Sequence, residues 1–397
     1  MQRVLIIQAV MKQFRVPFFS RLHAALRREG IDLRVAYSAP NRAQALRQDN
    51  VDLPTEFGHK VPAYWLGQRL VYQPLRHEIM RADLVITGPE NKYINNLLLL
   101  LLSALGLKTV GFWGLGPNMH PDRRYVISEW IKERLVTSVD WWFAYTESVA
   151  SKLRQHGMPE DRITNVQNAT DTTELRRLLA EISEEEVSQA KKDLTGNADS
   201  KVGLYCGRLA HPKALPFLLE SARLVKQRCP EFHLVVVGNG PDRIWFEQAI
   251  AAAPWIHYMG SKWGRESALF YKMADLFLLP GSAGLAVVDS FAAGLPLIAT
   301  DLPTHPPEIS YLRDGEEGRI TFHRPRDFAN AVIEVLATPA LMAKLSHGAL
   351  DARSKYTMEA MVENFSSGIK KCLANRSGIA SEPFVGVPHK AERDSVV

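Results

Sequence analysis

The feature that most constrains this chain is a regular alternation of short apolar runs with amphipathic stretches. Runs of three to six residues, rich in Val, Ile, Leu and aromatic residues, predict buried strands, and the stretches between them predict helices. Strands that alternate with helices indicate parallel sheets with helical crossovers, so we predict an α/β chain. The expected strands form two series, namely Val4–Gln8, Asp32–Tyr37, Leu84–Thr87, Thr109–Trp113, Trp142–Tyr145 and Ile163–Val166, then Val202–Cys206, His233–Val237, His257–Met259, Leu276–Leu279 and Leu297–Ala299.

A polar, acidic stretch from Glu181 to Ser200 precedes the second series, and we predict a domain boundary between Thr172 and Ser200. We therefore expect an N-terminal domain over residues 1–180 and a C-terminal domain over residues 181–355. From residue 375 to 397, Ser, Gly, Pro and charged residues without periodicity predict a disordered tail. The clearest helical patterns are Phe18–Glu29, Phe328–Ala337, Ala340–Leu350 and Tyr356–Leu373.

Cysteine content and apolar runs bear on location. The three cysteines cannot form a disulfide framework and none has CxxC spacing, so we expect a reducing, cytoplasmic location and no zinc site. The apolar start of the chain is too short for a signal peptide. The longest apolar run, Leu97–Leu107, is shorter than the roughly 20 residues of a spanning helix. It predicts a buried helix behind a sheet, with a membrane-facing helix as the alternative.

Positive charge is concentrated near the N-terminus. Residues 1–50 carry nine Lys and Arg against three Asp and Glu, a local excess of +6 where the whole chain has +5. Such an excess is typical of proteins that bind nucleic acid, an anionic membrane or an anionic substrate, and it also occurs on solvated surfaces without a partner. The basic residues are not interleaved with a stacking platform, which argues against nucleic acid.

The first motif in the second half of the chain is a strand that ends at Gly207, followed by Arg208 and, five residues on, by Lys213 at a helix start. Ligands of parallel sheets bind beyond the carboxyl ends of the strands. Two cations at such an edge, next to a helix N-terminus, are suited to a diphosphate. The alternative is a loop with two surface cations.

Three further motifs follow in order. The turn at Gly238 lacks G-x-G-x-x-G spacing, so it predicts either close approach to a ligand or a structural turn rather than a dinucleotide site. A helix that begins near Gly284 and Leu285 has free N–H groups for an anion. Asp289, about one turn later, can accept two ribose hydroxyls, or it can simply favour the helix N-terminus. Glu308 is either a functional carboxylate or a helix-start residue.

Taken in order, these segments resemble the retaining GT-B glycosyltransferases of family GT4, also called glycosyltransferases group 1. That family carries Gly-Arg-Leu…Lys, Gly-x-Gly-Pro and Glu-x7-Glu segments downstream of an Asn-Gly-Val-Asp junction, which corresponds here to Asn168-Ala-Thr-Asp171. The resemblance covers residues 163–318, while the first 160 residues match only in their strand–helix rhythm. It implies two Rossmann-like domains facing a cleft, with the last helix, 356–374, crossing back to the N-terminal domain.

The resemblance also implies a nucleotide-sugar donor on the C-terminal domain and an acceptor on the N-terminal domain. Arg208 and Lys213 would hold the donor diphosphate, Gly284 and Leu285 would present N–H groups, and Asp289 would bind the ribose. Gly207, Gly238, Gly260 and Glu308 are the further donor-site candidates. The first Glu of the pair corresponds to Gly281, and Asp289 is one methylene shorter than the usual second Glu. His120 is the nearest match to an N-terminal contact residue of the family.

The function expected from the sequence is transfer of a sugar, with retention, to a lipid-linked or cell-surface glycan, as in polysaccharide or lipopolysaccharide assembly. Arg208 and Lys213 would stabilise the leaving diphosphate without a metal or another cofactor. Arg15 and the helix Phe18–Arg28 would face the acceptor or an anionic membrane at the inner face of the cell. The alternatives are a nucleotide-sugar-binding protein without turnover and a GT-B-type UDP-sugar epimerase, while the missing glycine fingerprint argues against a nicotinamide dehydrogenase.

Overall fold

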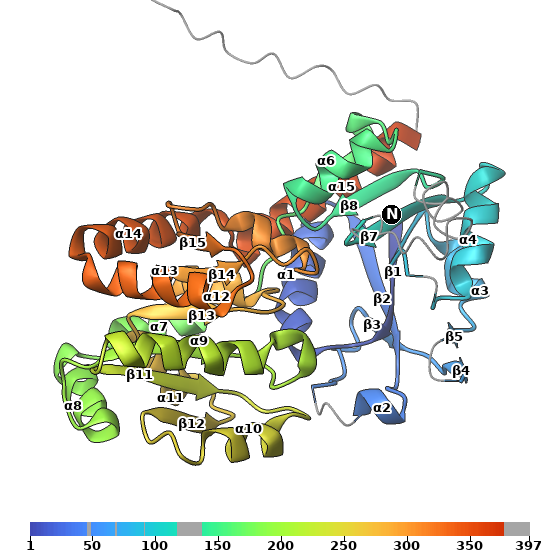
Figure 1. Ribbon diagram of the computed structural model, residues 1–397. Coiled ribbons are helices and arrows are strands. Elements are labelled where there is room, and N and C mark those ends of the chain that lie inside the picture. Colours follow the sequence, from blue (N-terminus) through green and yellow to red (C-terminus); the bar gives the residue numbers. More distant parts are fainter. Residues whose placement is uncertain (46–48, 68–69, 91, 117–136, 377–397) are drawn as a thin grey trace, which may run out of the picture.

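The protein, described by a computed structural model, consists of two α/β units (Figure 1). The structure describes all residues except 46–48, 68–69, 91, 117–136 and 377–397. The first sheet has seven parallel strands in the order β3-β2-β1-β6-β7-β8-β9. Its strands are β1 (Gln2–Val10), β2 (Ile31–Ser38), β3 (Gly58–Lys60), β6 (Leu84–Thr87), β7 (Thr109–Gly114), β8 (Trp141–Ala144) and β9 (Ile163–Asn165); a small antiparallel hairpin joins β4 (Tyr64–Leu66) to β5 (Leu70–Tyr72).

The second sheet has six parallel strands in the order β12-β11-β10-β13-β14-β15. All eleven strands expected from the sequence are present, with ends shifted by a few residues. The short strands β3, β4, β5 and β15 were not predicted. The strands of this sheet are β10 (Lys201–Cys206), β11 (Phe232–Val237), β12 (Ile256–Gly260), β13 (Leu276–Leu279), β14 (Leu297–Thr300) and β15 (Gly318–Thr321).

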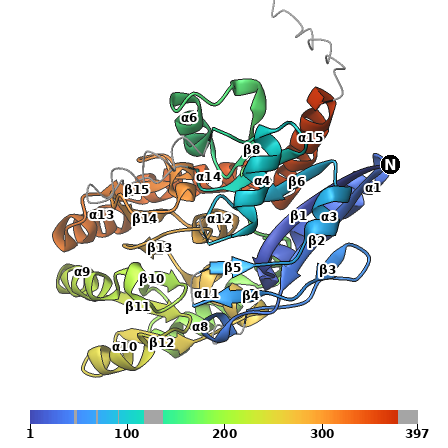
Figure 2. The same ribbon diagram turned by 90° about the vertical axis from the view of Figure 1, so that its right-hand side faces the viewer.

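Helices cover both faces of each sheet (Figures 1 and 2). The helices of the first unit are α1 (Val16–Arg28), α2 (Arg42–Ala45), α3 (Arg76–Arg81), α4 (Asn95–Ala104) and α6 (Glu147–Gln155), with α15 (Met358–Arg376) added from the end of the chain. Those of the second unit are α7 (Thr173–Glu181), α8 (Glu184–Thr195), α9 (Leu215–Arg228), α10 (Arg243–Ile250), α11 (Gly264–Met273), α12 (Ala286–Ala292), α13 (Pro325–Ala337) and α14 (Pro339–Lys355). Short 3₁₀ turns are η1 (Gln13–Arg15), η3 (Glu160–Arg162), η4 (His211–Lys213) and η5 (Pro307–Tyr311).

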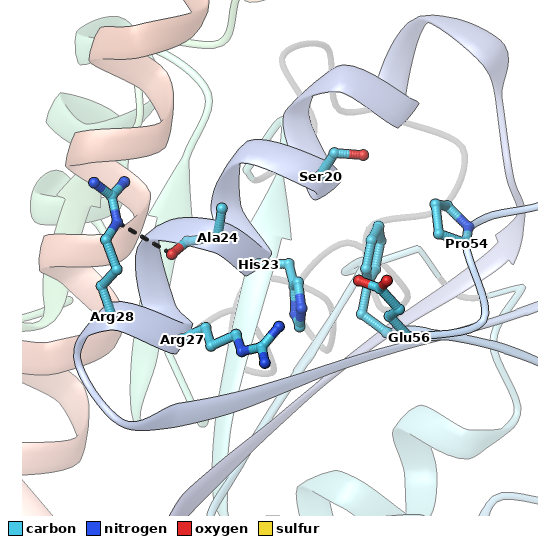
Figure 3. A pocket seen from close by; sticks show the side chains of 8 residues that line it. Ser20, His23, Ala24, Arg27, Arg28, Pro54 and Glu56 are labelled. Carbon is cyan, nitrogen blue, oxygen red and sulfur yellow. Dashed lines mark hydrogen bonds between the residues drawn. The ribbon is translucent and has the colours of Figure 1, made fainter.

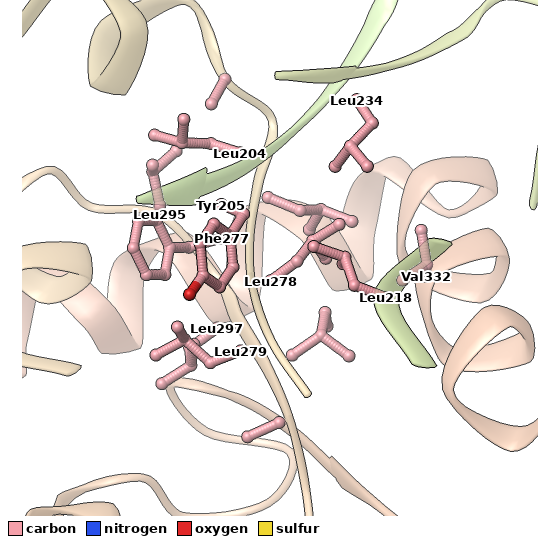
Figure 4. Close-up of a cluster of buried hydrophobic side chains, with 14 of the residues drawn as sticks. Leu204, Tyr205, Leu218, Leu234, Phe277, Leu278, Leu279, Leu295, Leu297 and Val332 are labelled. Atoms are coloured by element: carbon pink, nitrogen blue, oxygen red, sulfur yellow. The ribbon is translucent and has the colours of Figure 1, made fainter. Parts of the chain in front are cut away.

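The core of the second unit explains why its strands are continuous apolar runs. Leu204 on β10 and Leu278 on β13 are buried, with the helices α9 and α13 packed over one face of the sheet (Figure 4). Strands covered on both faces need apolar residues at successive positions. The two faces of the first sheet form separate cores in the same way, one beneath α1 and α15 and the other beneath α3, α4 and α6.

The last helix returns to the first unit, as the resemblance implied. Phe365 of α15 stacks on Phe143 of β8 with ring centroids 4.4 Å apart, and it also contacts Phe18 of α1 at 5.3 Å. Met361 and Ile369 are fully buried in the same core. The chain therefore crosses between the units twice, once after β9 and once before α15, and the predicted GT-B architecture is confirmed.

Helix α7, which begins at Thr173, packs with the second unit. Leu178 of α7 packs against Ala268 and Met273 of α11, in the second unit. Residues 173–180, which the prediction assigned to the first domain, therefore belong structurally to the second. The acidic residues that guided the limits 1–180 and 181–355 lie in the first turn of α8 rather than in the linker between the units. The predicted tail, 375–397, lies almost entirely outside the described residues.

The prediction of a buried helix at Leu97–Leu107 is wrong. Helix α4 buries Leu99, Asn95 and Asn96, whereas Leu97 is 71% exposed and Leu101 is 56% exposed. One side of the helix covers the first sheet, and no described residue covers the other side. Among the described residues, no single helix is long and apolar enough to cross a membrane; one sharply bent pair, Pro325–Ala337 with Pro339–Asn375, passes the same test of length and composition.

Candidate functional site

Three of the predicted glycines meet at the carboxyl edge of the second sheet. The N–H of Gly207 donates to the carbonyl of Val237 at 2.9 Å, and the N–H of Gly238 donates to the carbonyl of Gly260 at 2.7 Å. These bonds join the ends of β10, β11 and β12 in one row. The carboxyl edge of a parallel sheet is where ligands of such folds bind, so the row forms the floor of the candidate donor site.

The turn at Gly238 needs glycine because it touches the neighbouring strand end. Gly238 has φ of 136°, and a Cβ there would lie 1.9 Å from the carbonyl oxygen of Gly207. Likewise, a Cβ at Gly240 would lie 2.0 Å from the carbonyl oxygen of Leu209. Of the two interpretations that the sequence left open for this turn, the backbone packing supports the structural one. The glycines hold the loop that carries Arg208 close to the sheet edge.

The two predicted phosphate-binding cations differ in their surroundings. Arg208 is exposed, and no described residue forms an ion pair or hydrogen bond with its guanidinium. Lys213 is half-buried, its ammonium donates to the carbonyl of Ser282, and loss of hydration lowers its pKa. Arg208 is therefore the cation available to an incoming anion, while Lys213 also ties the loop after β10 to the loop after β13.

The backbone fills the space that a side chain at Gly281 would need. A Cβ at this position would lie 2.4 Å from the carbonyl carbon of Lys213 and 2.6 Å from the carbonyl oxygen of Pro212. The N–H of Ser282 donates to the same Pro212 oxygen at 2.8 Å, and Ala214 completes the turn with φ of 52°. The tight turn at His211–Lys213 therefore leaves no room at position 281 for the side chain of the family's first Glu.

Replacing Gly281 by Glu is therefore expected to destabilise the protein rather than to raise any activity. Inserting a side chain into packing this tight costs about 1–3 kcal/mol. We expect a lower melting temperature for Gly281→Glu, measured by circular dichroism. Gly281→Ala should lose a comparable amount, because the clash begins at Cβ. If both variants melt like the parent protein, the packing described for this turn is wrong.

Asp289 lies one turn into α12, beyond the loop that follows β13. Burial of the carboxyl raises its pKa to about 7, although the residue keeps some exposure at the loop edge. In the described structure no protein acceptor takes the N–H groups of Gly284 and Leu285, which open this helix. A Cβ at Gly284, where φ is 56°, would meet no atom within 4 Å, so the space beside it is open.

A buried histidine that the sequence did not single out positions this loop. His305 Nδ1 accepts the N–H of Ala283 at 3.2 Å, and Nε2 donates to the carbonyl of Thr300 at 3.0 Å. This arrangement requires the neutral ring, and burial lowers the pKa of His305 accordingly. The only local signal was a histidine followed by Pro-Pro, which is too weak to assign a role.

Arg15 and Glu308, both predicted to contact substrates, are joined to each other through Asn168. Arg15 Nη1 donates to Asn168 Oδ1 at 2.8 Å, and Asn168 Nδ2 donates to Glu308 Oε1 at 2.5 Å. Glu308 is 3% exposed and its pKa is raised by burial, while the Arg15 guanidinium lies 4.8 Å from the centre of the Trp113 ring. This chain of bonds links the two units where the first crossover leaves β9.

Several of the basic side chains of residues 1–50 are paired with carboxylates. Arg21 pairs with Asp171 at 2.7 Å and with Glu359 at 2.5 Å, and Lys12 pairs with Asp49 at 2.6 Å. Arg27 and Arg28 line a hollow of about 620 Å³ at the end of α1 (Figure 3). Because α1 runs back from the carboxyl end of β1, that hollow lies toward the opposite edge of the sheet. The predicted acceptor-facing role of helix Phe18–Arg28 is therefore not supported.

His120 lies outside the described residues, so its predicted role is not addressed. Among the residues that the structure describes, no group of three or more His, Cys, Asp or Glu side chains is arranged to hold a metal ion.

The two parallel sheets with their covering helices define a protein of the GT-B fold. Residues 200–338 match the family described as Glycosyl transferases group 1, and the resemblance predicted from the sequence is confirmed. The matched segment contains Gly207, Arg208, Lys213, Asp289 and the glycine row, so the recognisable part of the chain is the candidate donor site.

Among characterised proteins, the chain is similar to alpha-monoglucosyldiacylglycerol synthase of Acholeplasma laidlawii, with 27% identity over 43% of this chain. It is also similar to phosphatidyl-myo-inositol mannosyltransferase of Mycobacterium tuberculosis, with 30% identity over 34% of this chain. The matches span 44% and 36% of these two relatives, less than half of each. In structure, the chain resembles HepE of Anabaena in complex with UDP, with a TM-score of 0.67, 13% identity, and coverage of 93% of this chain and 100% of that one.

Proposed function

We propose that this chain transfers a sugar from a nucleotide-diphosphate sugar to a lipid-linked or cell-surface glycan acceptor, with retention of configuration. The observation that carries the proposal is the exposed Arg208 beside the glycine row and the Lys213 loop, at the carboxyl edge of the second sheet. A guanidinium without a protein partner at a ligand-binding edge is suited to a diphosphate, which it can bind with two parallel hydrogen bonds.

In the proposed reaction, the bond from the sugar to the diphosphate breaks as the acceptor hydroxyl forms a new bond on the same face. Arg208 and Lys213 stabilise the charge that develops on the leaving diphosphate, so the proposal requires no bound metal. The leaving phosphate is the group closest to the incoming hydroxyl, and it accepts the proton that the hydroxyl loses. Asp289 fixes the ribose, and the N–H groups of Gly284 and Leu285 face the phosphate or the sugar.

The acceptor class is supported by the related proteins and by topology. One relative is named as an alpha-monoglucosyldiacylglycerol synthase and the other as a phosphatidyl-myo-inositol mannosyltransferase. The lipids in both names support a lipid-linked acceptor here and work at the inner face of a membrane. Lys12 and Arg15 follow the carboxyl end of β1 in the first unit. Arg15 donates to Asn168, which lies in the first crossover from this unit to the one that carries the candidate donor site.

A panel of nucleotides and nucleotide sugars tests the donor part of the proposal. UDP, GDP and ADP, and one sugar form of each, should include a ligand that raises the melting temperature, because a ligand that binds only the folded state stabilises it. The selected donor is then incubated with and without a membrane-lipid extract as the acceptor source, also in the presence of a metal chelator. Sugar transfer that depends on the extract supports the proposal. Conversion of the donor alone indicates the epimerase, and binding without turnover indicates a nucleotide-sugar-binding protein.

A further inference from the structure

Exposed apolar side chains are gathered on one face of the first unit. They lie on α4, on the loop that follows it and at the end of α3, which Figures 1 and 2 show side by side. Their exposed fractions range from 41% to 71%. We call this set the α4 face, and it comprises Met80, Leu97, Leu98, Leu101, Leu105 and Leu107. Groups of exposed apolar side chains on soluble proteins often mark a site that binds a partner or a membrane.

The β4–β5 hairpin extends the same face with residues suited to a membrane interface. Tyr64 and Tyr72 are 60% and 40% exposed, and their rings stack 6.3 Å apart. Leu66 and Leu70, beside them, are 61% and 41% exposed. Tyrosines with an apolar ring and a polar hydroxyl prefer the depth of the lipid headgroups, between water and the acyl chains.

The surroundings of the α4 face are basic. Residues 58–108, which form it, contain six Lys and Arg against three Asp and Glu, whereas residues 95–107 carry no charge. Lys108 donates to the carbonyls of Met80 at 2.7 Å and Ala82 at 2.6 Å, which fastens the end of the α4 segment to α3. Next to Met80, Arg81 lines a hollow of about 250 Å³ together with Glu78 and with Arg3 and Arg34, both of which pair with Asp32.

We propose that the α4 face and the β4–β5 hairpin dock this protein on an anionic phospholipid surface. The helix is uncharged and apolar, and basic residues surround it. Its leucines insert among the acyl chains of such a surface, and the basic residues pair with the acidic headgroups. At ten residues, α4 is too short to span a bilayer and lies along the interface. A second copy of the chain is a poorer occupant, because a symmetric pair would place this basic face against itself.

This docking also places the carboxyl edge of the first sheet near the membrane, and in that respect it rests on the proposed function. Asn96 Nδ2 donates to the carbonyl of Gly88, directly after the carboxyl end of β6, at 2.8 Å. Helix α4 therefore begins at the ligand-binding edge of the first sheet and runs away from it. A lipid-linked acceptor that leaves the bilayer beside Leu97 and Leu98 reaches that edge without crossing water.

Vesicle sedimentation of the full chain, without donor or acceptor, tests the proposal. Vesicles of phosphatidylcholine mixed with phosphatidylglycerol should bind the protein, and phosphatidylcholine alone should bind it much less. Leu97→Ser together with Leu101→Ser should weaken binding to the mixed vesicles by roughly tenfold to a hundredfold, since each inserted leucine contributes on the order of a factor of ten. Both side chains are exposed, so the fold should survive, as circular dichroism can verify.

The matched control is Ile244→Ser with Trp245→Ser, two exposed apolar residues of α10 in the second unit. This pair, and charge reversal of Arg27 and Arg28 on α1, should leave vesicle binding unchanged. Equal binding of the Leu97/Leu101 variant and the parent overturns the proposal. The proposal is also overturned if the parent protein is dimeric by light scattering and the Leu97/Leu101 variant is monomeric, because a second copy of the chain then covers the face. Vesicle binding without sugar transfer in the donor assay contradicts the proposed function and leaves the docking intact.

Discussion

Arg208→Ala is expected to lower kcat/KM for sugar transfer by about 100- to 1,000-fold, the usual loss when one stabilising group is removed from a developing charge. The exposed guanidinium has no partner among the described residues, and the backbone under it is held by the glycine turn rather than by the side chain. Its removal should therefore leave the melting temperature within about one degree of the parent, because surface substitutions of this kind change stability little.

Steady-state kinetics with the selected donor measure this effect, and two comparisons sharpen it. Arg243→Ala removes an exposed arginine that follows the same glycine turn but is paired with Glu247 at 2.9 Å, and it should change transfer little. Lys213→Ala should reduce both transfer and melting temperature, since its ammonium also holds the carbonyl of Ser282. Transfer by Arg208→Ala near the parent rate would remove Arg208 from the proposed mechanism.

The sequence predicted both sheets because their strands are buried on both faces. β11 is apolar at Leu234, Val235, Val236 and Val237, and such a continuous run is typical of a strand buried on both faces. The strand β15, Gly318–Thr321, escaped prediction because three of its four residues are only partly buried. The run Leu97–Leu107 was misassigned because local composition shows that a helix is apolar, but only tertiary packing decides whether anything covers it.

The sequence predicted those parts of the candidate site that neighbouring residues in the chain define. It did not predict the contacts between segments that are distant in the chain. Gly207, Arg208 and Asp289 lie on strand ends and helix starts that their own neighbours in sequence define. The bonds from Arg15 through Asn168 to Glu308 join segments separated by 153 and 140 residues, so no local pattern could indicate them. The backbone contact that closes the space at Gly281 likewise depends on a turn that lies far away in sequence.

Asp289 should make donor binding depend on pH. Its pKa of about 7 in the free protein means that the carboxyl is protonated below that value and ionised above it. The proposed contact needs the ionised form, because both ribose hydroxyls donate to its oxygens, so binding lowers this pKa and releases a proton. Affinity should therefore fall as pH decreases through 7, by about tenfold between pH 8 and pH 6, and should level off above pH 8.

Isothermal titration of a nucleotide sugar measures this dependence, since its diphosphate, unlike that of the free nucleotide, has no ionisation near neutral pH. Asp289→Asn should weaken binding at pH 8 by about 10- to 100-fold, the loss expected when a hydrogen bond to a charged group is replaced by one to a neutral amide. The same variant should bind with an affinity that changes little between pH 6 and pH 8. Burial lowers the pKa of His305, whose neutral ring holds the same loop, so this histidine does not account for a change between pH 6 and pH 8. A pH dependence that persists in Asp289→Asn would therefore contradict the role proposed for Asp289.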